Sequence, residues 1–452
     1  MNHKRTLITI LLCLTPIWLW ANGEGSATVS LLANLDQYKS SRYNDCWGYT
    51  APDGREYALL GVLGGTSIID IADENNPREV VFIRSDFSEW KDIKTYGHYA
   101  YVCTETAAIV QIIDLSSLPN SARAINTYSG LETTPHNMFI DEEMAILYVA
   151  EDFNTNRAVV ALSLQDPVNP VELSRFGPDS HDMFAQDSVL YVAEGSRPSI
   201  GIFDMRNPRN PKLLVRHNIP GGGYVHNVWV SEDNKIMMTT EETVGRSVKL
   251  WNIEDLENID LLDDYLASER LAHNVYIKGN YAYVSHYADG LRILDITNPW
   301  SIREAGYYDT QIGGRINDGA WGAYPFFESG KILISDITTG LYIVRFNQFT
   351  VDVPEAPAAP TDFSLQQNYP NPFNPQTTIP FQLPESMDVK LEIYNASGQL
   401  VRTLIQGARD AGAHRVTWDG RGDVGGAVGS GVYVYRLLGE GFTLSRKMIY
   451  IR

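Results

Sequence analysis

The chain has 452 residues, of which 44% are hydrophobic and 20% charged, and its formal net charge is −19. This length exceeds what one ordinary hydrophobic core supports, so we expect a folded protein with more than one domain. The negative charge excludes nucleic acid and anionic membrane surfaces as main partners, because binding to phosphate groups requires clustered Lys and Arg.

The first 23 residues have the layout of a cleaved export signal. Lys4 and Arg5 form a basic start, and the apolar run Leu7–Trp20 is too short to span a bilayer comfortably. Ala21 and Gly23 then supply the small residues that signal peptidase prefers. We therefore expect residues 1–23 to be a signal peptide and the remainder to be secreted. No other segment is apolar enough to be transmembrane.

From about residue 44 to residue 349 the chain repeats one pattern seven times. LAHNVYIKGNYAYVSHY, starting at residue 271, is echoed upstream by YVHNVWVSEDNKIMMTT, DSHDMFAQDSVLYVAEG and TPHNMFIDEEMAILYVAED. Aligned on the His-Asn position, the equivalents lie 44 to 47 residues apart, at Asn44, Lys91, His136, His181, His226, His273 and Asn317. So regular a spacing predicts seven equal structural units.

Each unit has the residue pattern of four short strands. Two alternating apolar runs are joined by a turn, a third run often ends in Asp, as at Asp70 and Asp204, and an Asn-Pro turn leads to a fourth run. No run shows the 3.6-residue period of a helix. Four antiparallel strands every 45 residues or so are typical of a propeller blade, so residues 24–350 are predicted to form a seven-bladed β-propeller in an all-β chain.

The two ends of the repeat region predict how the ring closes. The seventh unit stops at Phe349 without a fourth run, and ATVSLLANLDQY at residues 27–38 resembles the fourth runs of the other units. We expect residues 27–38 to be the closing strand of the last blade, which removes two exposed sheet edges. Cys46 and Cys103 lie about one repeat apart, so both a bridge between neighbouring units and two buried thiols remain open.

Two sets of polar residues recur once per unit, and propeller topology should bring both to one face near the axis. The first set is His136, His181, His226 and His273, continued one position later by Asp45, Asp92 and Asp318. The second set stands at the ends of the second strands: Glu151, Glu194 and His286, with Glu105 and Glu241 one residue out of register.

Two interpretations of these sets remain open. His and carboxylate side chains suit a metal or polar-ligand site at the channel mouth, with zinc or calcium as the candidate divalent ion, and they suit acid–base chemistry. A residue that recurs in each blade can instead serve the blade, and a first-strand His can hydrogen-bond the adjacent blade. No cofactor is certain from the sequence.

The remainder of the chain differs in composition. Residues 351–362 are rich in Pro and Ala without periodicity, as in a semi-rigid linker. Residues 363–452 contain short alternating runs separated by Gly-rich turns, which predicts a small immunoglobulin-like β-sandwich.

Particular motifs in both regions resemble known families. The third runs QIID, IIDI and RILDI resemble the LVIVD repeat, and the propeller region resembles the exported bacterial propellers grouped as choice-of-anchor B proteins. NYPNPFNP at residues 368–375, the Asp419-Gly420 turn and Gly431-Val432-Tyr433 resemble the C-terminal sorting domain of type IX secretion substrates, which is related to the immunoglobulin-like domain of flagellar hook-capping proteins. The resemblance implies export and an address read by secretion machinery, with the domain then removed or used for attachment to the outer surface. It implies no agreed catalytic activity.

The sequence thus favours a non-enzymatic extracellular binding or scaffold module, with an extracellular protein or glycan as its partner. The alternative is a metal-dependent hydrolase or lyase with a His/Glu site at the mouth of the propeller channel. The candidate ligand ring comprises His136, His181, His226, His273, Glu151, Glu194, His286 and Asp92, and the four first-strand histidines are the candidate metal ligands.

Overall fold

The computed structural model describes residues 23–39, 41–151, 157–268, 271–310, 315–347, 363–369, 371–423 and 425–451. All but one residue of the expected signal peptide, and all of the expected linker at 351–362, lie outside the described residues. The described part of the chain contains no helix that is long and apolar enough to cross a bilayer.

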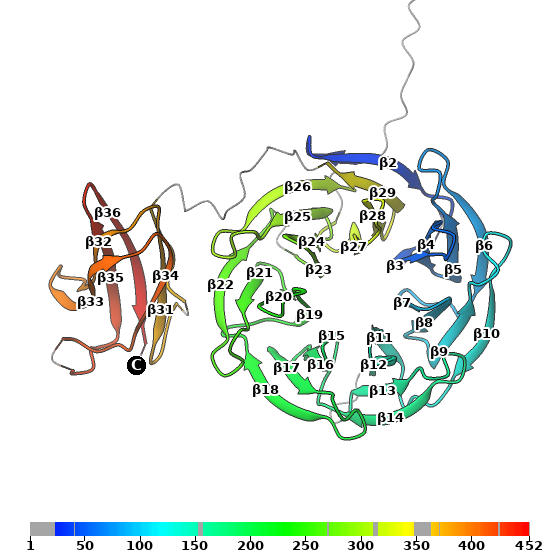
Figure 1. Ribbon diagram of the computed structural model, residues 1–452, viewed down its shortest axis with the longest axis horizontal. Helices are drawn as coiled ribbons and strands as arrows, with labels where there is room; N and C mark the ends of the chain where they lie inside the picture. Colours follow the sequence, from blue (N-terminus) through cyan, green and yellow to red (C-terminus); the bar gives the residue numbers. More distant parts are fainter. Residues whose placement is uncertain are drawn as a thin grey trace, which may run out of the picture.

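Within these ranges, seven four-stranded antiparallel arrangements stand around a central axis, and a separate pair of sheets follows (Figure 1). This confirms the predicted all-β fold of a seven-bladed propeller and a sandwich. Blades one to three comprise β3 (Tyr43–Thr50), β4 (Glu56–Val62), β5 (Gly65–Asp70) and β6 (Arg78–Arg84); β7 (Lys91–Tyr96), β8 (Tyr99–Thr104), β9 (Ala107–Asp114) and β10 (Arg123–Tyr128); and β11 (Pro135–Asp141), β12 (Ile146–Glu151), β13 (Val159–Ser163) and β14 (Val171–Phe176).

The remaining blades follow the same order from the axis outward. Blades four to seven comprise β15 (Asp182–Gln186), β16 (Val189–Ala193), β17 (Ser199–Asp204) and β18 (Lys212–Asn218); β19 (Val225–Val230), β20 (Ile236–Glu241), β21 (Val248–Asn252) and β22 (Asp260–Tyr265); β23 (Asn274–Lys278), β24 (Tyr281–Ser285), β25 (Leu291–Asp295) and β26 (Arg303–Asp309); and β27 (Ala320–Tyr324), β28 (Lys331–Asp336) and β29 (Gly340–Phe346).

The ring is closed by the N-terminal segment. Strand β2 (Val29–Leu35) pairs antiparallel with β29 and supplies the fourth strand of the last blade, inside the range 27–38 singled out from the sequence. Strand β1 (Glu24–Gly25) adds a short fifth strand to the outer edge of blade six. Asn347 at the end of the last blade donates a 2.6 Å hydrogen bond to Ser30. The N-terminal strand β2 and the last propeller strand β29 therefore share one sheet.

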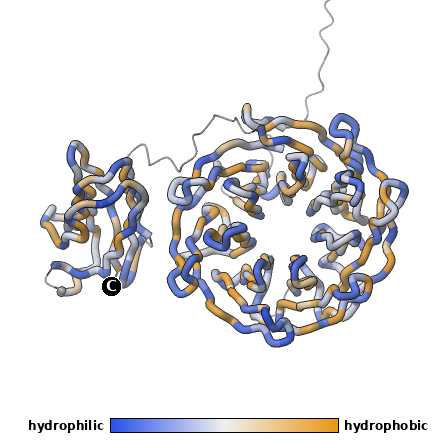
Figure 2. The backbone as a smooth tube through the Cα atoms, viewed as in Figure 1, coloured by the Kyte–Doolittle hydropathy of each residue, from blue (hydrophilic) through white to orange (hydrophobic). Residues whose placement is uncertain are grey.

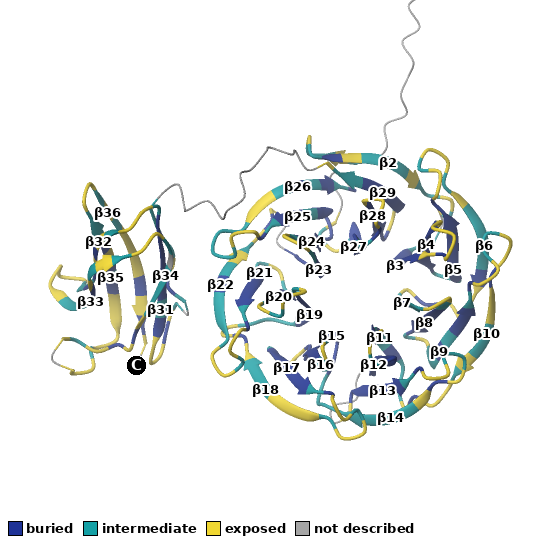
Figure 3. Cartoon of the chain, viewed as in Figure 1, coloured by how far each residue is buried: buried dark blue, intermediate teal, exposed yellow. Residues whose placement is uncertain are grey.

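The core lies in the contacts between blades. The three inner strands of each blade are mostly buried, whereas the outermost strand is half-buried or exposed (Figure 3), and apolar segments alternate with polar ones along the tube (Figure 2). One buried cluster joins Met138, Leu147 and Val160 of blade three to Tyr101 and Val110 of blade two. Such interfaces repeat around the ring, and burying each aliphatic side chain contributes roughly 1.5–3 kcal/mol.

The outermost strand pair of every blade carries a register shift. One example lies between Ile202 and Phe203, where β17 pairs with β18, and the other six outer pairs show the same irregularity. A bulge bends the strand and increases its twist, and a twisted edge is a poor template for pairing with another chain. The blades therefore present protected outer edges.

The C-terminal domain has its own core. One sheet contains β30 (Ser364–Leu365), β31 (Thr377–Leu383) and β34 (Gly412–Trp418), and the other contains β33 (Leu400–Arg409), β32 (Met387–Asn395), β35 (Gly431–Gly439) and β36 (Phe442–Tyr450). Trp418, Tyr435 and Phe373 are among the fully buried side chains of its single apolar cluster.

The NYPNPFNP motif fastens the last strand of this domain. The Phe373 ring packs on Trp418 and Tyr450 at centroid distances of 5.5 and 4.9 Å. The Phe373 amide donates to the carbonyl of Ile449, and its carbonyl accepts from the amide of Ile451, both at 3.0 Å. The Asn371 side chain also accepts from the Ile449 amide at 2.8 Å. The motif therefore has a direct structural role.

The two domains touch at the outer edge of blades five and six, next to β22 (Figure 1). Arg415 of β34 donates to Asp260 at 2.8 Å, and its guanidinium lies 3.7 Å from the centre of the Trp300 ring. Tyr369 contacts the Trp251 ring edge-on at 6.2 Å. The contact thus combines one ion pair with aromatic packing.

Both described cysteines are unbridged. Cys46 and Cys103 are free and buried, which selects the second of the two alternatives left open by the sequence. Burial raises the pKa of the Cys103 thiol well above its ordinary value, and the neighbouring Asp92 carboxylate adds to this effect.

Candidate functional site

Four histidines from consecutive blades pack against one another in tilted or edge-on contacts at the inner rim of the propeller. The ring centroids of His136 and His181 are 4.0 Å apart, those of His181 and His226 4.2 Å, and those of His226 and His273 4.1 Å. Each histidine stands at or just before the start of the first strand of its blade. Equal repeats place equivalent residues side by side, which is why the imidazoles meet. We call these four residues the histidine arc.

Two tryptophans continue the histidine arc. The Trp321 ring lies 4.0 Å from His273, and the Trp90 ring stacks on Trp321 at 4.4 Å. The sequence alignment assigned the seventh equivalent position to Asn317, but this is wrong, because β27 begins only at Ala320 and Asn317 lies in the preceding turn. Trp321 takes the place that histidine takes in blades three to six.

In several blades the residue after the arc position links neighbouring blades. Asp92 accepts a 2.7 Å hydrogen bond from the Met138 amide of the next blade. Asn227 donates to Asp182 of the preceding blade at 2.6 Å and accepts from the Val275 amide of the following blade at 3.0 Å. These bonds hold the inner strands together, so the main blade-to-blade role belongs to this position.

The imidazoles themselves are held mainly through Nδ1. His273 Nδ1 donates to the carbonyl of Trp321 at 2.6 Å, and His136 Nδ1 is bonded to the carboxylate of Glu105. Because a carbonyl or carboxylate oxygen only accepts, the proton sits on Nδ1 in both rings and the lone pair on Nε2. His181 Nδ1 pairs with the Tyr224 hydroxyl at 2.9 Å. The expectation of hydrogen bonds to adjacent blades therefore holds for these three rings.

Three ring nitrogens in the arc have no hydrogen-bond partner within the described residues. They are His181 Nε2, His226 Nδ1 and His273 Nε2, and all three residues are buried. Burial lowers the pKa of each of these histidines well below its ordinary value, and the neighbouring imidazoles lower it further. The arc therefore presents neutral imidazoles with lone pairs.

Two carboxylates flank the arc on the same face. Glu105 contacts His136, and Glu242 Oε2 lies 3.8 Å from His226 Nε2. The Tyr287 hydroxyl donates to Glu242 Oε1 at 2.5 Å, which fixes its orientation. Burial raises the pKa of Glu242, while the hydrogen bond from Tyr287 and the nearby His136 oppose this shift. The Glu242 side chain remains 32% exposed, so the arc has a carboxylate at its opening to solvent.

Of the second polar set singled out from the sequence, Glu105 reaches the arc at His136, but Glu151, Glu194 and His286 do not. Glu151 pairs with Arg175 at 2.5 Å and accepts the Thr133 amide at 3.2 Å. Glu194 pairs with Arg216 at 2.7 Å, and His286 Nδ1 lies 3.0 Å from Asp289. All three are fully buried within their own blades. Asp92, besides its link to Met138, is bonded to Lys94.

Sequence reasoning missed Glu242, Tyr224 and Tyr287. Glu241 was the residue singled out, and its carboxylate is bonded to Lys249 inside blade five. Glu242 is the first residue after β20, and its carboxylate lies 3.8 Å from His226 Nε2. The sequence feature from which Glu242 could have been considered is the pair of consecutive glutamates, Glu241 and Glu242.

Three members of the arc meet the geometric requirement for a shared ion. One donor atom from each of His136, His181 and His226 lies within 4.8 Å of the other two. A tetrahedral zinc ion with nitrogens at 2.0–2.1 Å needs donors roughly 3.4 Å apart, so the three imidazoles would have to move closer together on binding an ion.

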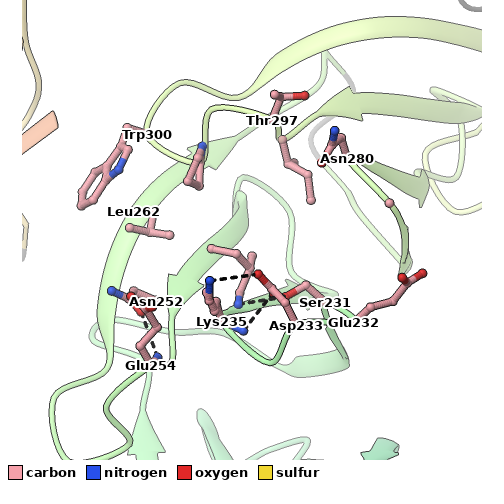
Figure 4. Close-up of a pocket in the computed structure, with 14 residues that line it drawn as sticks. Ser231, Glu232, Asp233, Lys235, Asn252, Glu254, Leu262, Asn280, Thr297 and Trp300 are labelled. Carbon is pink, nitrogen blue, oxygen red and sulfur yellow. Dashed lines mark hydrogen bonds and ion pairs between the residues drawn. The ribbon is translucent and has the colours of Figure 1, made fainter. Parts of the chain in front are cut away.

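A large open pocket lies away from the arc. A pocket of about 430 Å³ is lined by the β19–β20 hairpin at Ser231–Lys235 and by the turns near Asn252, Asn280 and Trp300 (Figure 4). The β19–β20 hairpin is at the end of the blade opposite His226, and Lys235 is paired with Asp233 at 3.6 Å. None of the residues singled out from the sequence lines this pocket.

Comparison with known proteins adds two domain-level findings. Residues 89–123 and 269–310, in blades two and six, match the LVIVD repeat family. The chain carries LVIVD repeats. Residues 369–439 match the FlgD Ig-like domain, so the predicted relation of the tail to hook-capping proteins is also confirmed. No curated protein sequence matches the chain significantly.

Two solved structures match about two thirds of the chain. Hydrazine synthase of Kuenenia stuttgartiensis matches with a TM-score of 0.50 at 12% identity, covering 66% of this chain and 94% of that one. The Cps50 (Swd1) β-propeller domain of Myceliophteria thermophila matches with a TM-score of 0.50 at 13% identity, covering 66% and 96%. At such identity these likenesses show the fold alone.

A third solved structure is PorZ of Porphyromonas gingivalis, an essential bacterial surface component of the type-IX secretion system. It matches with a TM-score of 0.45 at 13% identity over 88% of this chain. The chain spans 58% of the length of PorZ. A likeness of this size supports no inference about location or activity.

Proposed function

We propose that the chain is an exported β-propeller of the choice-of-anchor B kind that acts outside the cell as a binding or scaffold module. The observation that carries this proposal is the attachment of a FlgD-type immunoglobulin-like domain, with a core of its own, to a propeller with LVIVD repeats. The signal-like N-terminus and the NYPNPFNP motif point the same way. Signal peptidase and the secretion machinery are then its first partners.

The face that carries the histidine arc is the proposed binding face. Loops at the starts of first strands and at the ends of second strands meet there, and they expose Phe87 and Val244 by 74% and 61%. The half-buried Trp90 and the carboxylate of Glu242 lie on the same face. A rigid ring that presents aromatic, apolar and acidic groups suits an extracellular protein or glycan, because little order is lost on binding.

Export is tested by fractionating a bacterium that has a type IX secretion system. The full chain is expected at the outer surface or in the medium, and a chain ending at Asn347 is expected to remain in the periplasm. Leu400→Ala serves as a control inside the C-terminal domain, since Leu400 is 49% exposed and lies outside the motifs that resemble the sorting domain. Equal export of the truncated and full chains would refute the sorting role.

Binding is tested separately with glycan arrays and with intact cells. The labelled full chain is expected to bind a defined subset, and a Phe87→Ser/Val244→Ser variant is expected to lose that binding without a change in melting temperature. Unchanged binding by the variant would show that the ligand binds to another surface of the protein.

One observation favours the second candidate, a metal-dependent hydrolase or lyase. Three imidazoles converge beside a partly exposed carboxylate, the combination that metal-assisted hydrolysis uses. Metal-loaded protein is assayed on ester, phosphate, glycoside and uronate-containing substrates, with His226→Ala as the inactive reference. Turnover that disappears in His226→Ala would establish the enzyme, and no turnover on the panel would leave the binding module.

A further inference from the structure

We propose that His136, His181 and His226 bind one divalent transition-metal ion of the zinc class. The proposal uses the same face as the hydrolase candidate but requires neither catalysis nor export. It rests first on the three donor atoms that lie within 4.8 Å of one another. They come from three consecutive blades, so the ring fixes them independently of any flexible loop.

The state of the ring nitrogens supports a ligand. His181 and His226 are 7% and 2% exposed, and each has one ring nitrogen without a hydrogen-bond partner among the residues described. Buried polar atoms are nearly always paired, and each exception calls for an explanation. An ion shared by the imidazoles accounts for both nitrogens at once, which a purely structural aromatic stack does not.

The outer contacts are those that orient metal-binding histidines. A ligating imidazole usually gives its other ring nitrogen to a carboxylate, a carbonyl or a hydroxyl. Glu105 holds His136 in this way, and the Tyr224 hydroxyl lies 2.9 Å from His181 Nδ1. Glu242 is in turn oriented by Tyr287 at 2.5 Å. The candidate ligands are therefore already aligned by a second layer of contacts.

The donor set selects the class of ion. Imidazole nitrogens suit zinc, copper, nickel and cobalt, whereas calcium and magnesium take oxygen ligands. The glutamates that could serve calcium, Glu151 and Glu194, are engaged by Arg175 and Arg216. Neutral imidazoles need no proton release to bind an ion, and Glu242 offsets part of its charge. Because Glu242 beside His226 is 32% exposed, this side of the arc opens to solvent.

The test uses the full chain without a polyhistidine tag, stripped with a chelator and titrated with Zn²⁺ and then with Co²⁺. We expect one ion per chain by elemental mass spectrometry, a visible Co²⁺ spectrum typical of tetrahedral coordination, and a melting temperature that rises with Zn²⁺ concentration. Absence of stoichiometric binding by the folded wild-type chain would overturn the proposal.

Matched variants locate the ion. His181→Gln and His226→Gln are expected to weaken Zn²⁺ binding at least 100-fold, while His98→Gln, at an exposed position, leaves it unchanged. Should a ligand variant fold poorly, Tyr224→Phe and Glu105→Gln alter only the outer contacts and are expected to weaken binding about 10- to 100-fold. Binding that survives all four substitutions would place the ion elsewhere and refute the site. Cell fractionation is unaffected by either result, so failure here is distinct from failure of the export proposal.

Discussion

Asn227 donates a 2.6 Å hydrogen bond from its side-chain amide to the carboxylate of Asp182 in the preceding blade. The same side chain accepts from the Val275 amide of the following blade. One carboxamide thus joins three consecutive blades at their inner strands, directly behind the histidine arc.

Replacing Asn227 with Ala should destabilise the propeller by about 2–4 kcal/mol. The change removes a hydrogen-bond partner from the buried Asp182 carboxylate and from the Val275 amide. Each unsatisfied buried group costs roughly 1–3 kcal/mol. Urea unfolding followed by fluorescence measures the change. Asn258→Ala is the control, because Asn258 bonds only within an exposed turn, and it should stay within about 0.5 kcal/mol of wild type. Equal effects of the two substitutions would contradict the linking role.

Glu151→Gln should destabilise blade three by about 3 kcal/mol and leave Zn²⁺ binding unchanged. Removing one partner of a buried ion pair leaves the other charge uncompensated, here that of Arg175, although Glu172 at 3.0 Å retains part of the pairing. Denaturant unfolding gives the stability, and metal titration gives the occupancy. Loss of metal together with stability would show that Glu151 reaches the arc after all.

Phe373→Ala should unfold the C-terminal domain at lower temperature, at a cost of about 3–5 kcal/mol for truncating a buried Phe. The ring fills the space between Trp418 and Tyr450, and its backbone pairs with the last strand. Calorimetry should show the domain transition shifted and the propeller transition unmoved. A shift of both transitions would mean that the domains unfold together.

Acid should weaken the fold through His217. This imidazole packs against Trp251 at 4.6 Å beside the domain contact, and burial lowers its pKa to about 4. The unfolded chain takes up the proton near its ordinary pKa of roughly 6.5, so stability falls as pH drops from there to about 4 and then levels off. His217→Gln should flatten this part of the curve in urea unfolding measured at several pH values, whereas His98→Gln should not. Parallel curves for His217→Gln and wild type would refute the assignment.

The thiols of Cys46 and Cys103 should be inert in the native protein. Both are fully buried, and burial raises the pKa of each, which keeps the reactive thiolate scarce. Ellman's reagent should therefore react slowly with the native chain starting at residue 24 and with both thiols once it is unfolded. A chain that shows no thiols in denaturant would contain the bridge that the structure lacks.

The fold could be predicted from the sequence because the repeat is compatible with few folds. Seven near-equal units with period-two alternation and Asn-Pro turns admit few arrangements other than blades. The seventh unit shows the limit of such alignment, since Trp321 does not resemble histidine and the turn before β27 displaces it from the expected spacing.

Only part of the candidate site could be predicted from the sequence. Spacing predicted that four histidines occupy equivalent places in consecutive blades, and their rings are in contact in the structure: His136, His181, His226 and His273. The acidic members depend on the direction in which each side chain points at the end of a strand. Glu241 points into blade five, while Glu242, the first residue after β20, lies beside His226, a distinction that composition and spacing do not carry.

The closing hydrogen bond between Ser30 and Asn347 joins residues 317 positions apart. During synthesis the first propeller strand emerges hundreds of residues before its partner β29, and pairing over such a separation is slow because a long loop must first be closed. The ring consequently stays an open arc of blades until nearly the whole propeller has been made. Under the export route proposed above, the propeller would therefore still lack its closed ring while most of the chain is being made.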